Sequence, residues 1–365
     1  KDNELQVKFA LSPVSTRGAV GNLIAEVPHW DFDRVKTEAR DQWNKELNKI
    51  DIEPAGEEEK SNFYTAMYHS FFGPTEYMDV DGQYRGLDQN IYKADNFVNY
   101  TSFSLWDTYR ALHPLFNIVQ PNRNTDMVES MLAHYDQSVH SMLPVWSHYA
   151  NENWCMIGYH SVSVIADAIV KGNDGFDTAH ALDAMVNTAT TGYYDGLKYY
   201  MDMGYVPEDK NGASVSKTLE YAYDDWCIAQ FAKELGKKQD HREFRKRSLS
   251  YKKLFDKQTS LLRPKHANGE WYAPFDPQAG ANFQANVGYI EGNAWQYVYM
   301  VPHDIQGMIQ LMGGKKKFLA QLDHIFEEGH FDMANEPDFG YPYLYTFVRG
   351  YEEKTQKKVD ELIAE

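Results

Sequence analysis

The side chains best suited to chemistry lie in residues 216–236, SKTLEYAYDDWCIAQFAKELG, where carboxylates are interspersed with aromatic rings. Glu220 and Asp224 are four residues apart, so they would share one face of a helix, with Asp225 beside them. Aromatic neighbours exclude water and raise the pKa of a carboxyl group, which suits a general acid. The alternative is a solvated acidic first turn that favours the helix dipole. The spacing leaves both interpretations open.

The same stretch predicts the helix that would position these carboxylates. Apolar residues recur at the three- and four-residue spacing of one helical face, at Leu219, Ala222, Trp226, Ala229 and Ala232. Gly236, followed by two lysines, predicts where the helix ends. We therefore expect a helix over about residues 217–235.

Three further motifs combine a carboxylate with aromatic residues. They are FSLWDTYR at 103–110, EGNAWQY at 291–297 and NEPDFGYPYLY at 335–345. Glycosidases need two carboxyl groups flanking the scissile bond, and inverting ones hold them roughly 6.5–9.5 Å apart to admit a water. Aromatic rings also stack on sugars, although the same rings are typical of an aromatic-rich core. The mixture fits glycoside hydrolysis without being a fingerprint of it.

Each of these residues also has a purely structural explanation. Asp107 would serve equally well as the cap of the helix that follows it. Asn335-Glu336-Pro337 is compatible with a turn, and its oxygens are also the hard ligands that Ca²⁺ takes. Asp79 and Asp81 resemble the start of a calcium loop, but no Glu stands at the twelfth position, so an EF-hand is excluded.

The composition excludes several classes of function. With 36 Lys and Arg against 53 Asp and Glu, the net charge of −17 argues against a nucleic-acid partner. The sequence contains no run of 18 apolar residues, so it predicts no membrane span. Two cysteines provide neither a disulfide framework nor a zinc site. HExxH, P-loop, GxSxG and dinucleotide motifs are absent from the sequence.

The chain is organised as a short extended segment followed by helices. Residues 1–28 alternate like a half-buried strand and are expected to be the last strand or linker of an upstream β-sandwich, with one helical domain over 29–365. Residues 74–103 are expected to form a long, ordered loop. Helices are expected at about 31–49, 57–72, 105–118, 123–140, 158–171, 177–193, 217–235, 240–258, 303–312, 314–328 and 354–364. Alternating short and long connections between them predict an (α/α) toroid whose long loops gather around one cleft.

Several long motifs together resemble glycoside hydrolase family 92. They are FSLWDTYRALHPL, MIGYHSVSVIADA, TLEYAYDDWCIAQFA, EGNAWQY with VYMVPHD, and NEPDFGYPYLY, and they occur in the family's order. The resemblance covers nearly the whole chain. It implies an (α/α)6 catalytic domain after an N-terminal β-sandwich, and a Ca²⁺-dependent, inverting exo-α-mannosidase acting on mannose-containing glycans.

The resemblance also implies residue roles. The general acid would be Glu220, and Trp106 and Asp107 would shape the mannose subsite. Ile290 and Glu291 would face the leaving group, where Ile290 replaces a histidine that α-1,2-specific members carry. The calcium site would involve Asn335, Glu336 and Gln296. Here the NEP motif continues with Asp338, Phe339 and Gly340 instead of Ser-His-His.

The family's GNDD motif, which supplies the catalytic base, would follow residue 365. We therefore expect a central piece of the enzyme, with an incomplete toroid and its general base beyond residue 365. Two alternatives remain open: a trehalase-like or glucan-processing glycosidase on the same toroid, and a non-catalytic glycan-binding protein. The family resemblance further implies a periplasmic, cell-surface or secreted location.

Overall fold

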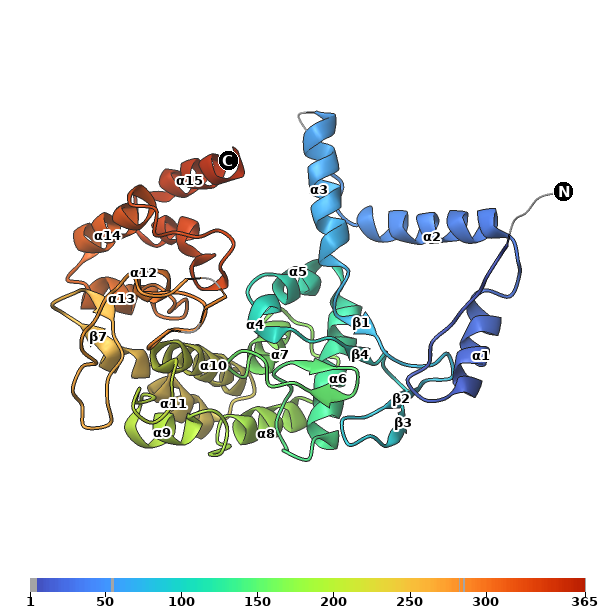
Figure 1. Ribbon diagram of the computed structural model, residues 1–365, viewed down its shortest axis with the longest axis horizontal. Helices are drawn as coiled ribbons and strands as arrows, with labels where there is room; N and C mark the ends of the chain where they lie inside the picture. The colour runs from blue at the N-terminus through green and yellow to red at the C-terminus, as the bar shows by residue number, and fades with distance from the viewer. Residues whose placement is uncertain (1–4, 54–55, 282, 285, 365) are drawn as a thin grey trace. The chain divides into compact units, whose positions relative to one another are not determined.

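The computed structural model describes residues 5–53, 56–281, 283–284 and 286–364 (Figure 1). The chain divides into two compact units. The first unit is Lys1–Met156 with Ser163–Ala184, and the second is Ile157–Val162 with Met185–Glu365.

In its described residues, the first unit contains helices and three short antiparallel ribbons, which pair β1 with β4, β2 with β3 and β5 with β6. Its elements, including two helices shared with the second unit, are α1 (Thr16–Glu26), α2 (Phe32–Leu47), α3 (Glu57–Ser70), β1 (Thr75–Glu76), β2 (Gln83–Arg85), β3 (Ile91–Lys93), β4 (Tyr100–Thr101), α4 (Leu105–Thr108), α5 (Leu112–Val119), α6 (Pro121–Gln137), β5 (Ser147–His148), β6 (Asn151–Glu152), α7 (Ser161–Val170) and α8 (Thr178–Thr188).

The longest helix of the second unit is α10, which contacts α11 and the 3-10 helix η1 (Figure 1). Its elements are α9 (Leu197–Met203), α10 (Ser214–Glu234), α11 (Lys238–Arg247), η1 (Ser250–Leu254), β7 (Phe255–Asp256), β8 (Leu261–Leu262), α12 (Ala294–Tyr297), α13 (Ile305–Leu311), α14 (Lys315–Glu327), η2 (Glu336–Asp338), η3 (Tyr341–Phe347) and α15 (Glu352–Ala364).

Helix α10 confirms the predicted helix and is buried on nearly all sides. Its apolar residues Leu219 and Ala222 are fully buried, and so are the carboxylates Glu220, Asp224 and Asp225. The interpretation of a solvated acidic first turn is therefore wrong. A buried carboxylate needs a specific partner to offset its lost hydration, so the surroundings of these three groups decide their role.

Both ends of α10 are closed by backbone hydrogen bonds. At the C-terminus, Gly236 has φ +69°, and the Lys237 N–H donates to the Ala232 carbonyl at 2.8 Å. This is the glycine-terminated end that the sequence predicts. At the N-terminus, the N–H groups of Val215 and Ser216 donate to the Gly288 carbonyl at 2.9 and 3.2 Å. A distant loop therefore satisfies donors that the first turn leaves open.

Several elements differ from the sequence prediction. Residues 16–26, expected to be extended, form helix α1, whose first turn is capped by the Ser15 hydroxyl accepting from the Gly18 N–H. The described residues 5–15 form no strand. The predicted helix over 105–118 is divided into α4 and α5, and the one over 240–258 ends at Arg247. The expected loop over 74–103 is ordered but contains the two ribbons β1–β4 and β2–β3.

Asp79 fastens α1 to the rest of the first unit, so its role is structural. One carboxylate oxygen accepts from the Ser12 hydroxyl at 2.7 Å and the other from the Asn22 side-chain amide at 2.8 Å. The Asn22 amide oxygen in turn accepts from the Val80 N–H at 2.9 Å. Asp79 and Asn22 are both buried, which makes these bonds costly to lose.

Replacing Asp79 by Ala is expected to detach α1 at a cost of about 1–3 kcal/mol, because buried donors lose their acceptor. Limited trypsin digestion at Arg17, inside α1, should become faster while the rest of the chain stays protected. Asp81→Ala is the matched control, since the exposed Asp81 carboxylate accepts only from Gln83 among the described hydrogen bonds. Equal digestion of the two variants would contradict the tethering role of Asp79.

Candidate active site

Two of the three buried α10 carboxylates flank one histidine. The Nδ1 atom of His160 lies 2.8 Å from Oδ1 of Asp224, and its Nε2 atom lies 3.5 Å from Oε2 of Glu220. His160 is 1% exposed and both carboxylates are fully buried. The helical spacing of four residues places the two carboxylates one turn apart, which leaves room for one imidazole ring between them. All three residues belong to the second unit.

The third carboxylate, Asp225, is held in a separate polar cluster. One oxygen accepts from the Tyr159 hydroxyl at 3.0 Å, and the other accepts from the Tyr200 hydroxyl at 2.8 Å and from Nε of Arg247 at 2.9 Å. Burial raises the pKa of Asp225 to about 6, against the opposing influence of Arg247 and the two hydroxyls. The carboxylate is thus ionised at neutral pH, and its partners fit a structural role rather than a catalytic one.

The loop that carries Ile290 and Glu291 lies against the first turn of α10. The Ile290 N–H donates to the Ser216 hydroxyl at 3.1 Å, beside the two bonds from α10 to the Gly288 carbonyl. Ser216 is four residues before Glu220 and therefore on the same helical face. The structure brings the predicted acid and the predicted leaving-group residues into one neighbourhood, with Glu291 in the left-handed region at φ +46°.

The NEP segment joins this neighbourhood through Asn335. Its side-chain amide donates to the Glu291 carbonyl at 2.6 Å. A Cβ atom on Gly292 would lie 3.0 Å from Oε1 of Gln296 and 3.2 Å from Nδ2 of Asn335. The side-chain amides of Gln296 and Asn335 therefore both lie next to Gly292. Glu336 begins the 3-10 helix η2 and is half-buried.

These residues fit a calcium site in the chemistry of their oxygens. Asn335 is 1% exposed, and its Oδ1 atom has no hydrogen-bond partner among the described residues. The Oε1 atom of Gln296 accepts from the Asn293 N–H at 3.2 Å in a capping box and keeps a second lone pair. Within the described ranges, no three His, Cys, Asp or Glu side chains gather to hold a metal. The candidate donors are therefore amide oxygens and one carboxylate, which suit a hard cation.

Trp106 and Asp107 lie on α4 in the first unit. Trp106 is 2% exposed, and the guanidinium of Arg110 lies 4.7 Å from its ring centroid. Asp107 is half-buried and accepts a hydrogen bond from the Ser104 hydroxyl. Asp107 lies inside α4, and α5 has Ala111 at its N-cap, so the helix-cap interpretation of Asp107 is wrong.

Residues 18–365 match the catalytic domain of glycosyl hydrolase family 92. The chain belongs to glycoside hydrolase family 92. Within that family it is 46% identical to an α-mannosidase of Bacteroides thetaiotaomicron solved in complex with mannoimidazole, with a TM-score of 0.93 over 97% of this chain and 48% of that one. It is 30% identical to an inverting mannosidase of the same bacterium, with a TM-score of 0.85 over 92% of this chain and 49% of that one.

A curated relative points the same way. A protein of Arthroderma benhamiae described as an uncharacterized secreted glycosidase is 27% identical over 383 residues, which cover 94% of this chain and 45% of that protein. The chain thus spans about half the length of the relatives it matches. The likeness to the family 92 structures confirms the predicted fold class, the mainly α (α/α)6 toroid.

The sequence pattern indicates Glu220 and Asp224 but not the histidine that lies between them. His160 stands in the motif MIGYHSVS, which contributed to the family 92 resemblance without receiving a role. A signal was available, because a lone histidine in an apolar segment is buried and needs a polar partner. That the partner would be a carboxylate 64 residues later, on α10, is a tertiary fact that spacing does not reveal.

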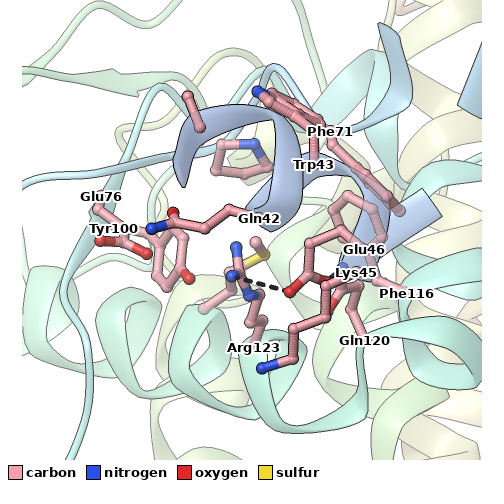
Figure 2. A pocket seen from close by; sticks show the side chains of 13 residues that line it. Gln42, Trp43, Lys45, Glu46, Phe71, Glu76, Tyr100, Phe116, Gln120 and Arg123 are labelled. Carbon is pink, nitrogen blue, oxygen red and sulfur yellow. Dashed lines mark hydrogen bonds and ion pairs between the residues drawn. The ribbon is translucent and has the colours of Figure 1, made fainter. Parts of the chain in front are cut away.

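A pocket of about 590 Å³ in the first unit does not belong to this site (Figure 2). It is lined by aromatic rings such as Trp43 and Phe116 and by two carboxylates, Glu46 and Glu76, of which Glu46 pairs with Arg123 at 3.5 Å. Burial raises the pKa of Glu46, but hydrogen bonds from Lys49 and Gln120 outweigh it and the net shift is downward. None of the family-motif residues lines this pocket.

Proposed function

We propose that the protein carrying this chain hydrolyses terminal α-linked mannose from glycans with inversion, and that Glu220 is the general acid. The observation that carries the proposal is the buried Glu220 carboxylate, held on α10 beside the loop of Ile290 and Glu291. Family membership supports it, as does the 46% identity to an α-mannosidase solved with mannoimidazole.

The residues of this chain would divide the work as follows. Glu220 protonates the glycosidic oxygen as the sugar leaves, while a carboxylate activates water on the opposite face. The family resemblance assigns that second carboxylate to a motif beyond residue 365. Ile290 and Glu291 would contact the leaving group, and Trp106 and Asp107 would shape the mannose subsite. With Ile290 in place of histidine, we expect a linkage preference other than α-1,2.

Calcium is part of this proposal. Asn335, Glu336 and Gln296 would hold the ion, with the buried Oδ1 of Asn335 as the best placed oxygen. When bound, Ca²⁺ would orient sugar hydroxyls and stabilise charge as a Lewis acid. The bond from Asn335 to the Glu291 carbonyl would connect the ion site to the leaving-group loop.

An extracytoplasmic location is also proposed, with mannose-containing glycans as partners. It rests on the relative described as a secreted glycosidase. Among the helices formed by described residues, none combines the length and hydropathy needed to cross a membrane.

Mannose release separates the proposal from its alternatives. We expect the intact protein to cleave aryl α-mannosides and a yeast-type mannan, but not α-glucosides or trehalose, and to lose activity when calcium is chelated. Calorimetric titration with Ca²⁺ of the chelator-treated protein gives a second readout that does not depend on turnover. Cleavage of α-glucosides would support the glucan-processing alternative, and binding of mannose without release would support the non-catalytic one. Mannose release that is unaffected by chelation would contradict the proposed calcium site but not the proposed hydrolysis of mannosides.

A further inference from the structure

The orientation of the His160 ring is fixed by its contact with Asp224. Its Nδ1 atom bonds to Oδ1 of Asp224 at 2.8 Å, and the neighbouring Tyr159 N–H donates to the other oxygen of the same carboxylate at 2.8 Å. Both oxygens of Asp224 are thus engaged by consecutive residues. A carboxylate fixed by a backbone N–H is a rigid support, so the imidazole ring cannot turn without breaking this bond.

The backbone before His160 is shaped to admit its ring. Gly158 has φ +83°, and a Cβ atom added there would lie 2.2 Å from the Nε2 atom of His160. Only glycine combines that backbone conformation with space for the ring. The Gly158 carbonyl accepts from the Tyr194 hydroxyl at 2.8 Å, which fixes this turn from the other side.

The remaining nitrogen of the ring faces the acid. Nε2 of His160 lies 3.5 Å from Oε2 of Glu220. Hydrogen bonds in active sites are often this long without substrate and become shorter when the substrate binds. Since Asp224 engages Nδ1, Nε2 is the ring atom that is directed at the Glu220 carboxyl group.

We propose that His160 is a positioning residue for the acid: supported by Asp224, its Nε2 atom holds Oε2 of Glu220 in place and leaves Oε1 to protonate the leaving group. This inference rests on the proposed function, because it assigns the orientation of an acid that must first be shown to act as one. In this proposal His160 acts through Glu220 and not on the sugar itself. The chain of contacts runs from the Tyr159 backbone through Asp224 and His160 to Glu220.

The test uses leaving groups of different basicity on the intact protein. A mannobiose leaving group needs a proton, whereas 2,4-dinitrophenolate leaves without one. In His160→Asn, the Asn amide keeps a donor toward Asp224, but nothing reaches Glu220. We expect kcat on mannobiose to fall about 10- to 100-fold, less than the roughly 10²- to 10⁴-fold that a general acid contributes, because Glu220 itself remains; kcat on the dinitrophenyl α-mannoside should change by less than about threefold.

Two further variants make the result specific. His134→Asn removes another buried histidine, whose Nδ1 lies 3.0 Å from the Ser147 hydroxyl, and should affect both substrates equally. Asp224→Asn withdraws the support of the ring and should reproduce the selective loss on mannobiose. It also serves if His160→Asn does not fold, as judged by circular dichroism.

The outcomes separate three claims: the positioning role of His160, the acid role of Glu220 and the hydrolysis of α-mannosides. If Glu220→Gln shows the selective loss but His160→Asn and Asp224→Asn reduce both substrates equally, the positioning role is wrong and the acid assignment stands. If Glu220→Gln shows no selectivity, the acid assignment fails and the positioning role fails with it. If the unmodified protein cleaves no α-mannoside, the proposed function itself is wrong.

Discussion

Glu220→Gln is expected to lower the turnover of a natural α-mannoside by about 10³-fold, near the middle of the range that general acid catalysis contributes. The amide has the shape of the carboxyl group but no acidic proton, so an alkoxide would have to leave unprotonated. An α-mannoside with a dinitrophenolate leaving group should lose far less, since that group is stable as an anion. Steady-state kinetics on both substrates measure the difference.

The control lies on the same helix. Glu234 is exposed in the last turn of α10, so Glu234→Gln removes one carboxylate from the helix without touching the buried cluster. It should leave both substrates unaffected. Turnover of the natural glycan close to that of the unmodified protein in Glu220→Gln would remove Glu220 from the acid role.

Arg247→Met is expected to destabilise the second unit by about 3–5 kcal/mol, the cost of removing one partner from a buried ion pair. Asp225 is fully buried and would keep two hydroxyl donors but lose its counter-charge. Arg247 also donates to the Ala189 carbonyl at 2.9 Å, so that acceptor is left open as well. Chemical denaturation at constant pH measures the loss.

The loss should shrink as the pH falls. Burial already raises the pKa of Asp225 to about 6, and removing Arg247 removes the main influence that opposes burial. A carboxyl whose pKa is higher in the folded than in the unfolded state favours folding at low pH and loses that contribution as the pH rises through the folded value. Arg247→Met should therefore cost less at pH 5 than at pH 8. Arg245→Met, which breaks a bond to the Ser248 hydroxyl, should cost the same at both, and a loss independent of pH in Arg247→Met would contradict the explanation.

The sequence predicted best where local and tertiary preferences agree. Helix α10 has apolar spacing along its length and a glycine after its last turn, so its extent was predictable to within three residues at either end. The sequence does not predict helix α1, because the alternation of apolar residues at 5–11 favours a strand and the extended segment is expected to continue to residue 28. Ser15, which caps α1, is a local signal for a helix. The split between α4 and α5 was not predicted, because the apolar pattern continues across it.

The candidate site divides in the same way. Motifs assign Glu220, Ile290 and Asn335 to the site, and the structure connects their segments through Ser216 and the Glu291 carbonyl. Their mutual distances were not predictable, since they depend on contacts between residues more than forty positions apart. The pairing of His160 with two carboxylates escaped prediction for the same reason. Spacing along one helix placed Glu220 and Asp224 correctly, but nothing local indicated which side chain fills the space between them.

The bonds from α10 to the Gly288 carbonyl have an evolutionary consequence. Backbone atoms make both of these bonds, and the backbone N–H of Ile290 is the donor to the Ser216 hydroxyl. Side chains at positions 290 and 291 can therefore change during divergence without releasing the loop from the helix that carries Glu220. If the proposed roles hold, such an arrangement separates selectivity from cleavage, so that point mutations at positions 290 and 291 would change the glycan preference while Glu220 keeps its place.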